Sequence, residues 1–170
     1  METDNYIFFY GHKPNKWGTN VFSQWFPVKF TEKWDSETKL VFNNTEQYMM
    51  AHKALLFGDA IIFLEIMDTS SPFTIKKLGR NIKKFDPKIW NDHKFNIVVE
   101  GNRLKFNQNP ELMDVLLKTG NKTIVEASPY DKIWGIGITA EKAINIPENK
   151  WPGQNLLGHA LMVVRSEYNS

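Results

Sequence analysis

The chain has 170 residues, and its 21 lysines and arginines against 19 aspartates and glutamates leave a formal net charge of +2. That charge is too small to indicate a general binder of nucleic acids or membranes. Cysteine is absent, which excludes disulfides, thiolate zinc sites, iron–sulfur clusters and a cysteine nucleophile. Because the sequence shows no signal or transmembrane pattern, we expect a soluble, cytoplasmic protein with no membrane partner.

The first forty residues are rich in aromatic side chains and are interrupted by glycines and prolines, a pattern typical of short strands joined by loops. We expect strands near residues 6–10, 28–31 and 39–42. Asn44 and Gln47 then precede an apolar stripe that ends at Gly58. This spacing predicts an N-cap, a capping box and a helix over residues 45–57.

The rest of the chain is predominantly helical in pattern. We expect helices at residues 59–67, 72–82, 87–106 and 110–118, and the last three open with a proline, which the first helical turn tolerates. A strand at 123–126, an irregular stretch at 127–152 and a closing helix at 153–168 follow. These elements predict an α+β fold: a helix-dominated single domain over residues 1–170 with mainly N-terminal short strands.

Two residues of the predicted 45–57 helix are candidates for a ligand site. Glu46 falls in the first turn and Lys53 lies seven residues later, so both side chains can point at one ligand from the same face. An acid in the first turn is also common in ordinary helices, where it complements the helix dipole. Lys53 would equally suit an exposed helix face.

The segment 76–88 holds six cations and one acid, a charge of +5 that leaves −3 for the rest of the chain. It includes Arg80, one of only three arginines. A guanidinium group can bind phosphate or carboxylate through two parallel hydrogen bonds. The segment therefore suits an anionic ligand, although a solvated helix face gives the same pattern.

The stretch 128–137 combines an acid, an indole and two glycines outside any predicted element. Asp131 is a candidate acid, base or cation stabiliser, and Trp134 a candidate stacking surface for a base. Gly135 and Gly137 permit a close approach of the backbone. A packed Ω-loop anchored by its tryptophan is the alternative interpretation.

Motifs for metals and cofactors are missing. The four histidines are scattered without a metal-binding spacing, and Gly120-Asn-Lys-Thr123 lacks the glycines of a phosphate loop. We therefore expect neither a bound metal nor a cofactor.

Blocks of sequence spread over nearly the whole chain resemble the NADAR domain, also called the YbiA-like family. They are Phe9-Tyr10, Phe22-Ser-Gln-Trp-Phe-Pro27, Asn44-Thr-Glu-Gln-Tyr-Met-Met-Ala-His-Lys-Ala-Leu-Leu-Phe-Gly-Asp59, Leu78-Gly-Arg80, Trp90, Lys105-Phe106, Leu116-Leu-Lys-Thr-Gly120, Val125-Glu-Ala-Ser128, Asp131-Lys-Ile-Trp-Gly-Ile-Gly137, Gly153-Gln-Asn-Leu-Leu-Gly158 and Leu161-Met-Val-Val-Arg165. One departure is Gln24, which stands where the family has an asparagine.

The resemblance implies an α+β fold and a metal-independent N-glycosidase, a hydrolase that cleaves the bond between a ribose C1′ and a nitrogen. The activity that we expect is the removal of ADP-ribose from guanine bases of DNA or RNA, which reverses an ADP-ribosylation. An alternative substrate is a phosphorylated intermediate of riboflavin biosynthesis, which would lose its ribose phosphate. A non-catalytic ADP-ribose or nucleotide-binding module is the alternative of a different class.

Breaking a ribosyl C–N bond passes through an oxocarbenium-like state, which needs negative charge near C1′ and a proton for the leaving base. We assign Glu46 and Asp131 to these two tasks. Lys53 would hold phosphate or capture C1′ as an imine. The expected substrate-binding residues are Arg80 for phosphate, Trp90 and Trp134 for the base or adenine, and Gly135, Gly137 and Asn155.

Overall fold

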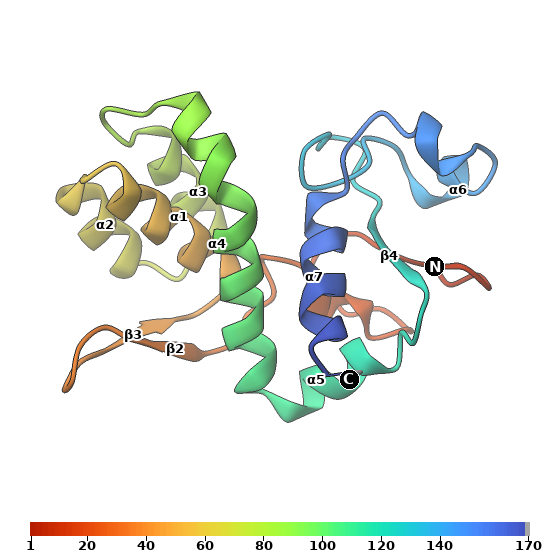
Figure 1. Cartoon of the computed structure of the whole chain (residues 1–170), viewed down its shortest axis with the longest axis horizontal. Helices are drawn as coiled ribbons and strands as arrows, with labels where there is room; N and C mark the ends of the chain where they lie inside the picture. Colours follow the sequence, from red (N-terminus) through yellow and green to blue (C-terminus); the bar gives the residue numbers. More distant parts are fainter. Residues whose placement is uncertain (169–170) are drawn as a thin grey trace. The chain divides into compact units, whose positions relative to one another are not determined.

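The computed structural model describes residues 1–168, and contacts group the chain into two units. Unit 1 comprises Met1–Phe26 and the chain from Pro110 onward, and unit 2 is Pro27–Asn109. Over the described residues, helices dominate and the short strands form two two-stranded sheets (Figure 1). The predicted α+β fold is confirmed. The single domain over residues 1–170 stays a prediction, and each unit is described by itself.

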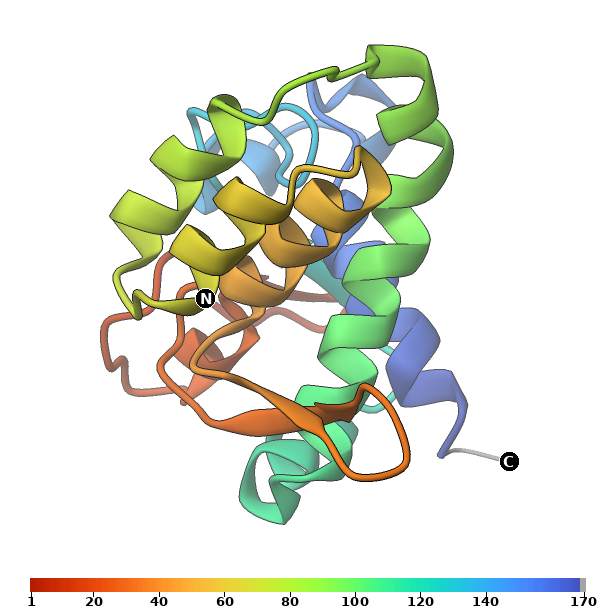
Figure 2. The ribbon, with the colours of Figure 1, turned by 90° about the vertical axis from the view of Figure 1, so that its left-hand side faces the viewer.

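Unit 2 begins with a β-hairpin and continues as helices. In the hairpin, β2 (Phe30–Lys33) pairs antiparallel with β3 (Lys39–Phe42), which places Phe30 opposite Phe42. The helices that follow are α1 (Thr45–Leu56), α2 (Ala60–Met67), α3 (Pro72–Arg80) and α4 (Pro87–Asn107). Helix α1 packs against each of the other three, and Figure 2 shows α1, α2 and α3 side by side.

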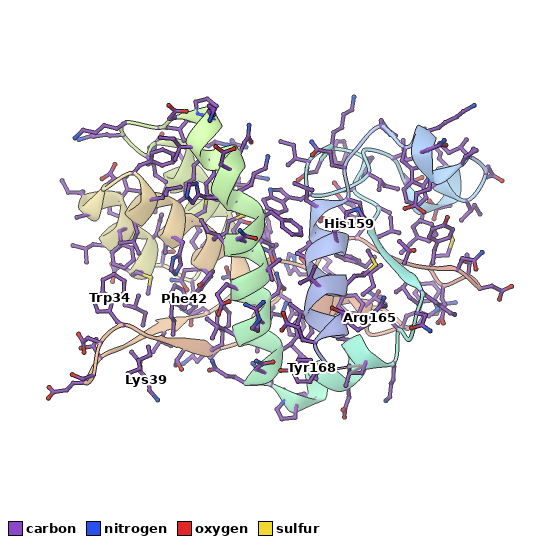
Figure 3. The ribbon with its side chains drawn as sticks, viewed as in Figure 1. Trp34, Lys39, Phe42, His159, Arg165 and Tyr168 are labelled. Carbon is purple, nitrogen blue, oxygen red and sulfur yellow. The ribbon has the colours of Figure 1, made fainter. Side chains whose placement is uncertain are left out.

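Aromatic rings fasten the hairpin to α1. The ring of Phe42 lies 5.6 Å from that of Phe30 and meets Tyr48 of α1 edge-on at 5.0 Å, and all three are almost completely buried. Burying such a side chain contributes about 1.5–3 kcal/mol. The Glu32 carboxylate adds a polar link, since it accepts from the Tyr48 hydroxyl (3.0 Å) and lies 2.8 Å from His52 Nε2. Figure 3 shows Phe42 between β3 and α1.

Unit 1 is built on a parallel pair of strands from distant parts of the sequence. Strand β1 (Tyr6–Phe9) lies beside β4 (Thr123–Glu126), with Tyr6 opposite Thr123. The remaining elements are the 3-10 helices η1 (Thr19–Phe22) and η2 (Glu148–Lys150) and the helices α5 (Pro110–Leu117), α6 (Ala140–Ala143) and α7 (Leu156–Ser166). Helix α7 packs on β4 (Figure 1).

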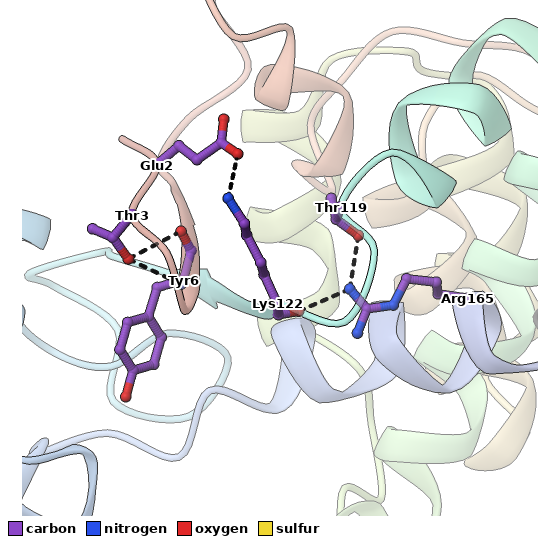
Figure 4. A network of polar contacts seen from close by, with 6 residues as sticks. All are labelled: Glu2, Thr3, Tyr6, Thr119, Lys122 and Arg165. Atoms are coloured by element: carbon purple, nitrogen blue, oxygen red, sulfur yellow. Dashed lines mark hydrogen bonds and ion pairs between the residues drawn. The ribbon is translucent and has the colours of Figure 1, made fainter.

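Arg165 fastens the last turn of α7 to the turn before β4. Its Nη1 donates to the Thr119 hydroxyl (2.7 Å) and to the Lys122 carbonyl (2.8 Å), as Figure 4 shows. The Lys122 ammonium in turn donates to the Glu2 carboxylate (2.6 Å). Burial lowers the pKa of Arg165. This arginine therefore serves the fold of unit 1.

Several element bounds differ from the sequence prediction. Strand β2 begins at Phe30, not at residue 28, because its register is set by the partner strand. Helix α3 ends at Arg80, two residues early, and the stretch 127–152 contains α6 and η2. Helix η1 was not predicted.

The closing helix α7 begins at Leu156 and not at residue 153. Asn155 has a left-handed φ of 53°, which interrupts helical geometry. Just before it, the Gly153 N–H donates to the Ile136 carbonyl (2.8 Å). Residues 153–155 thus belong to the loop that precedes α7. The helix ends at Ser166.

Candidate active site

The polar residues around the first turn of α1 fix its geometry. The Asn44 side chain accepts from the Gln47 N–H (2.8 Å), as predicted. The Gln47 side-chain oxygen accepts from the Asn43 N–H (2.7 Å), so the box closes one residue earlier than predicted. The Gln47 amide also donates to the Ile66 carbonyl (3.0 Å) at the end of α2. Glu46 sits within this arrangement and is only 5% exposed.

Lys53 lies two turns along α1 from Glu46 and is partly buried. Its ammonium donates to the Gly79 carbonyl of α3 (2.9 Å) and lies 4.4 Å from the centre of the Phe85 ring and 5.4 Å from that of Trp90. Burial lowers the pKa of Lys53, and the Glu46 charge raises it in part. The neutral, nucleophilic amine is therefore reached at a lower pH than on an exposed lysine.

Of the two rings beside Lys53, the sequence predicted that of Trp90 as part of the site but not that of Phe85. Trp90, near the start of α4, was expected to stack on a base, and its ring faces the Lys53 ammonium. Phe85 was missed. It is 43% exposed, lies between α3 and α4, and also meets the Phe57 ring edge-on at 5.3 Å. Its position within the charged segment 76–88 was the only signal available.

Arg80 is the last residue of α3 and is exposed. Among residues 1–168, its guanidinium makes no hydrogen bond or ion pair. The other two arginines are engaged, since Arg165 binds Thr119 and Arg103 pairs with Glu100 on α4. Arg80 is therefore the arginine whose fork is open to an anion.

In unit 1, Asp131 organises the loop that follows β4. Its Oδ1 accepts from the N–H groups of Ile133 and Trp134, both at 2.8 Å, which closes a tight turn. The Trp134 carbonyl then accepts from the Leu157 N–H in α7 (3.1 Å). Within the described part of the chain, the second oxygen of Asp131 accepts no hydrogen bond. Asp131 thus shapes the loop and keeps one oxygen available.

The glycines of this loop bring two segments of the protein's own backbone together. A Cβ on Gly153 would lie 2.3 Å from the Gly135 carbonyl oxygen, and a Cβ on Gly135 would lie 2.9 Å from the Glu126 carbonyl oxygen. Gly137 has a left-handed φ of 73°. The close approach at Gly135 is therefore to Gly153, and a contact of Gly135 or Gly137 with substrate stays a prediction.

Asn155 is buried and binds β4 through both polar atoms of its side chain. Its Nδ2 donates to the Ile124 carbonyl and its Oδ1 accepts from the Glu126 N–H, each at 2.9 Å. These bonds hold the residue in its left-handed conformation at the start of α7. A contact of Asn155 with substrate also stays a prediction.

Each unit has a hollow on its own surface. In unit 2, a hollow of about 340 Å³ is lined by residues that include Phe57, Asp59, Lys83 and Lys84. In unit 1, a hollow of about 380 Å³ is lined by residues that include Glu148, Trp151, Gln154, Asn155 and His159, the last of which is labelled in Figure 3.

The predicted site residues fall into two groups, each described within its own unit. Unit 2 holds Glu46, Lys53, Arg80 and Trp90, and unit 1 holds Asp131, Trp134, Gly135, Gly137 and Asn155. Between Met1 and Tyr168, no three histidine, aspartate or glutamate side chains cluster as a metal site would require. None of the helices described is long and apolar enough to cross a membrane.

Comparisons with known proteins agree with one another. The NADAR domain model matches residues 8–169. N-glycosidase R617 of Acanthamoeba polyphaga mimivirus is 62% identical over 98% of each chain. The chloroplastic riboflavin biosynthesis protein PYRR of Zea mays is 33% identical over 72% of this chain and 19% of that protein. The solution structure of Escherichia coli YbiA matches with a TM-score of 0.75 and 27% identity, and covers 99% of this chain and 88% of that one.

Proposed function

The chain belongs to the NADAR domain family, and from that premise we propose that it is an N-glycosidase that hydrolyses a ribosyl C1′–N bond. The observation that carries the proposal is the pairing on α1 of a buried carboxylate, Glu46, with Lys53, an amine of lowered pKa. A carboxylate stabilises the positive charge that develops on the ribose, and an amine binds phosphate or attacks C1′.

We propose ADP-ribosylated guanine in DNA or RNA as the substrate. Such a substrate brings a pyrophosphate and further phosphates, and the segment 76–88 offers a charge of +5 with Arg80 unengaged. The riboflavin intermediate is the second candidate, because a plant relative carries a riboflavin biosynthesis name. That compact substrate needs only one anion site, so most cations of the segment 76–88 would not contact it.

In the proposed reaction, Glu46 acts on the ribose side, where it stabilises the cation or orients water. Asp131 acts on the leaving base through its second oxygen, and the two roles can be exchanged. The joint site of Glu46 and Asp131 is part of the proposal, since the two residues belong to different units. The reaction needs no metal, because both tasks fall to carboxylates.

Lys53 has a second proposed role as the nucleophile. Its neutral amine would attack C1′, the C1′–N bond to the base would break, and the base nitrogen would keep the electron pair and take a proton from the acid. Opening of the ribose ring gives an imine, with the amine proton passing to O4′, and water then releases the sugar and restores the amine. Borohydride would reduce that imine and leave a stable adduct at Lys53, whereas the absence of any adduct during turnover would assign Lys53 to phosphate alone.

The test is to incubate the protein with an ADP-ribosylated guanine oligonucleotide and, separately, with phosphorylated riboflavin intermediates. We expect release of ADP-ribose from the first and slower or no release of ribose phosphate from the second. The reverse preference would establish the second candidate. Binding of either compound without release would contradict an enzyme and favour a binding module.

A further inference from the structure

The charged segment forms one exposed face of unit 2. Its cations are all exposed, and we call them the basic face: Lys76, Lys77, Arg80, Lys83, Lys84 and Lys88. The single acid in the segment, Asp86, caps α4 through its Oδ1, which accepts from the Lys88 N–H (2.8 Å) and the Ile89 N–H (3.2 Å). The Lys88 ammonium pairs with the Asp92 carboxylate (3.3 Å), so the other five cations carry the excess positive charge. The positive potential therefore reaches solvent.

The hollow of about 340 Å³ continues this face. Lys83 and Lys84 line it together with the start of α2. Its acid, Asp59, accepts from the Lys83 N–H (2.9 Å) and the Ile62 N–H (3.2 Å), and these backbone bonds lower the pKa of Asp59. Lys84 has a left-handed φ of 55°, which is strained for a residue with a side chain. Two lysine side chains thus border a concave surface large enough for part of a chain molecule.

Exposed aromatic rings accompany the cations. Phe73 is 71% exposed in α3, and Phe85 is 43% exposed directly after Lys84. Cations that follow a phosphate backbone, interleaved with rings on which bases stack, are the features by which proteins bind single strands. A paired base has no free face for such stacking, so this arrangement fits an unpaired strand.

We propose that the basic face binds the sugar–phosphate backbone of a single-stranded polynucleotide, with one base stacked on the face of the Phe85 ring that the Lys53 ammonium does not cover. The proposal rests on the proposed function only for the identity of the strand, which would be the one that carries the modified guanine. Binding of an unmodified strand requires no catalysis, so the two can fail separately.

The test is the binding of an unmodified, fluorescently labelled thymidine oligonucleotide, followed by anisotropy over a range of salt concentrations. We expect affinity to fall steeply with salt. Each lost phosphate contact on a single strand reduces the log–log slope by about 0.7, so K83E/K84E should reduce it by about 1.4 and weaken binding at low salt by at least about tenfold. Glu at residue 84 meets the same backbone strain as Lys, and the Lys83 N–H still donates to Asp59 when the side chain is changed. A denaturation curve of the variant checks that its fold is retained.

The matched control is K33E/K39E, which makes the same change in net charge on the β2–β3 hairpin. Lys33 and Lys39 are exposed and face each other across the two strands. We expect this variant to bind within about twofold of the unmodified chain, since its lysines lie outside the basic face. Equal weakening in both double variants would overturn the proposal, as would oligonucleotide binding that does not depend on salt.

Two further measurements separate stacking from charge and nucleic acid from lipid. Phe85→Leu keeps an apolar contact with Phe57 but removes the aromatic face, so affinity should fall about fivefold with the salt slope unchanged. An unchanged affinity would overturn the stacking. Binding to anionic phosphatidylserine vesicles in place of the oligonucleotide would overturn the proposed ligand. If the unmodified oligonucleotide binds but no ADP-ribose is released from the ADP-ribosylated guanine oligonucleotide, the basic face stands and the proposed function is removed.

Discussion

The surroundings of Lys53 in unit 2 and the loop of Asp131 and Asn155 in unit 1 use their polar groups differently. The Lys53 ammonium is held by one carbonyl and by the faces of two rings. Asp131 and Asn155 instead form short bonds to the N–H groups and a carbonyl of the backbone around them. Lys53 thus has one backbone contact and two contacts to rings, whereas the hydrogen bonds of Asp131 and Asn155 hold the main chain in place.

This difference separates two kinds of candidate. When Lys53 turns toward an anionic ligand it leaves the Gly79 carbonyl and the two rings, but the ligand accepts the hydrogen bond that the carbonyl gives up, so the net cost is about 0.5–1 kcal/mol for each ring face left. When Asn155 turns away, it leaves two buried backbone groups without partners, which costs about 1–3 kcal/mol for each. In the proposed reaction, Lys53 is therefore the group that can move, and Asp131 is the group whose position the loop fixes.

The largest expected effect is on turnover in Glu46→Gln. Glutamine keeps the size of the side chain but removes the charge, so turnover should fall about 10²–10⁴-fold while the free energy of unfolding changes by less than about 1 kcal/mol. The same change also removes the charge that raises the pKa of Lys53. The control is Glu65→Gln on the exposed side of α2. Turnover of E46Q within threefold of the unmodified chain would remove Glu46 from the site.

Asp131 can be tested with two variants that separate its charge from its turn. Asp131→Asn keeps an Oδ1 acceptor for Ile133 and Trp134, so the fold should be retained while turnover falls about 10²–10⁴-fold. Asp131→Ala should in addition lower the free energy of unfolding by about 1 kcal/mol, because the turn loses its acceptor. Turnover is measured for D131N, and denaturation curves are measured for both variants. Full activity in D131N would mean that Asp131 only shapes the turn and takes no part in the reaction.

Substitution of one glycine in each unit by alanine should change stability by different amounts. In α7, a Cβ on Gly158 would lie 2.1 Å from the Ile124 carbonyl oxygen of β4, which cannot move without the strand. In α3, a Cβ on Gly79 would lie 2.1 Å from the Met50 sulfur, which is the flexible tip of a side chain. We expect G158A to lower the free energy of unfolding by about 3 kcal/mol and G79A by less than about 1 kcal/mol. Equal losses in urea denaturation would contradict the contrast.

The predictable parts of the fold and site depend on residues near one another in the sequence. The helical repeat alone puts Lys53 two turns from Glu46, and the Asn44–Gln47 spacing alone starts α1, so both were predicted. The strand at 123–126 also follows from its own residues.

The parts that were missed depend on residues far apart in the sequence. Residues 153–155 do not join α7 because Gly153 packs on Gly135 and Asn155 binds β4, contacts that no local pattern reveals. Phe85 reaches Lys53 only once α3 and α4 pack against α1. The structural role of Asn155 also depends on distant residues, since its partners Ile124 and Glu126 lie in β4.

The smallest expected effect is at the link between the hairpin and α1. Burial raises the pKa of Glu32, but the hydrogen bond and charge of His52 and the bond from Tyr48 outweigh it and leave that pKa below its ordinary value of 4.5. The folded state thus takes up this proton less readily than the unfolded chain, so the link stabilises the fold above about pH 4.5 and is lost as pH falls through the lowered pKa.

Glu32→Gln removes the charge that binds His52, so it should lower the free energy of unfolding at pH 7. The loss should be only about 1 kcal/mol, because the pair is partly exposed to water. The difference from the unmodified chain should shrink as the pH is lowered below that window. Glu37→Gln, in the exposed hairpin turn, is the control and should show no such difference. A loss in E32Q that is the same at pH 7 and at pH 3 would mean that packing, and not the carboxylate charge, joins β2 to α1.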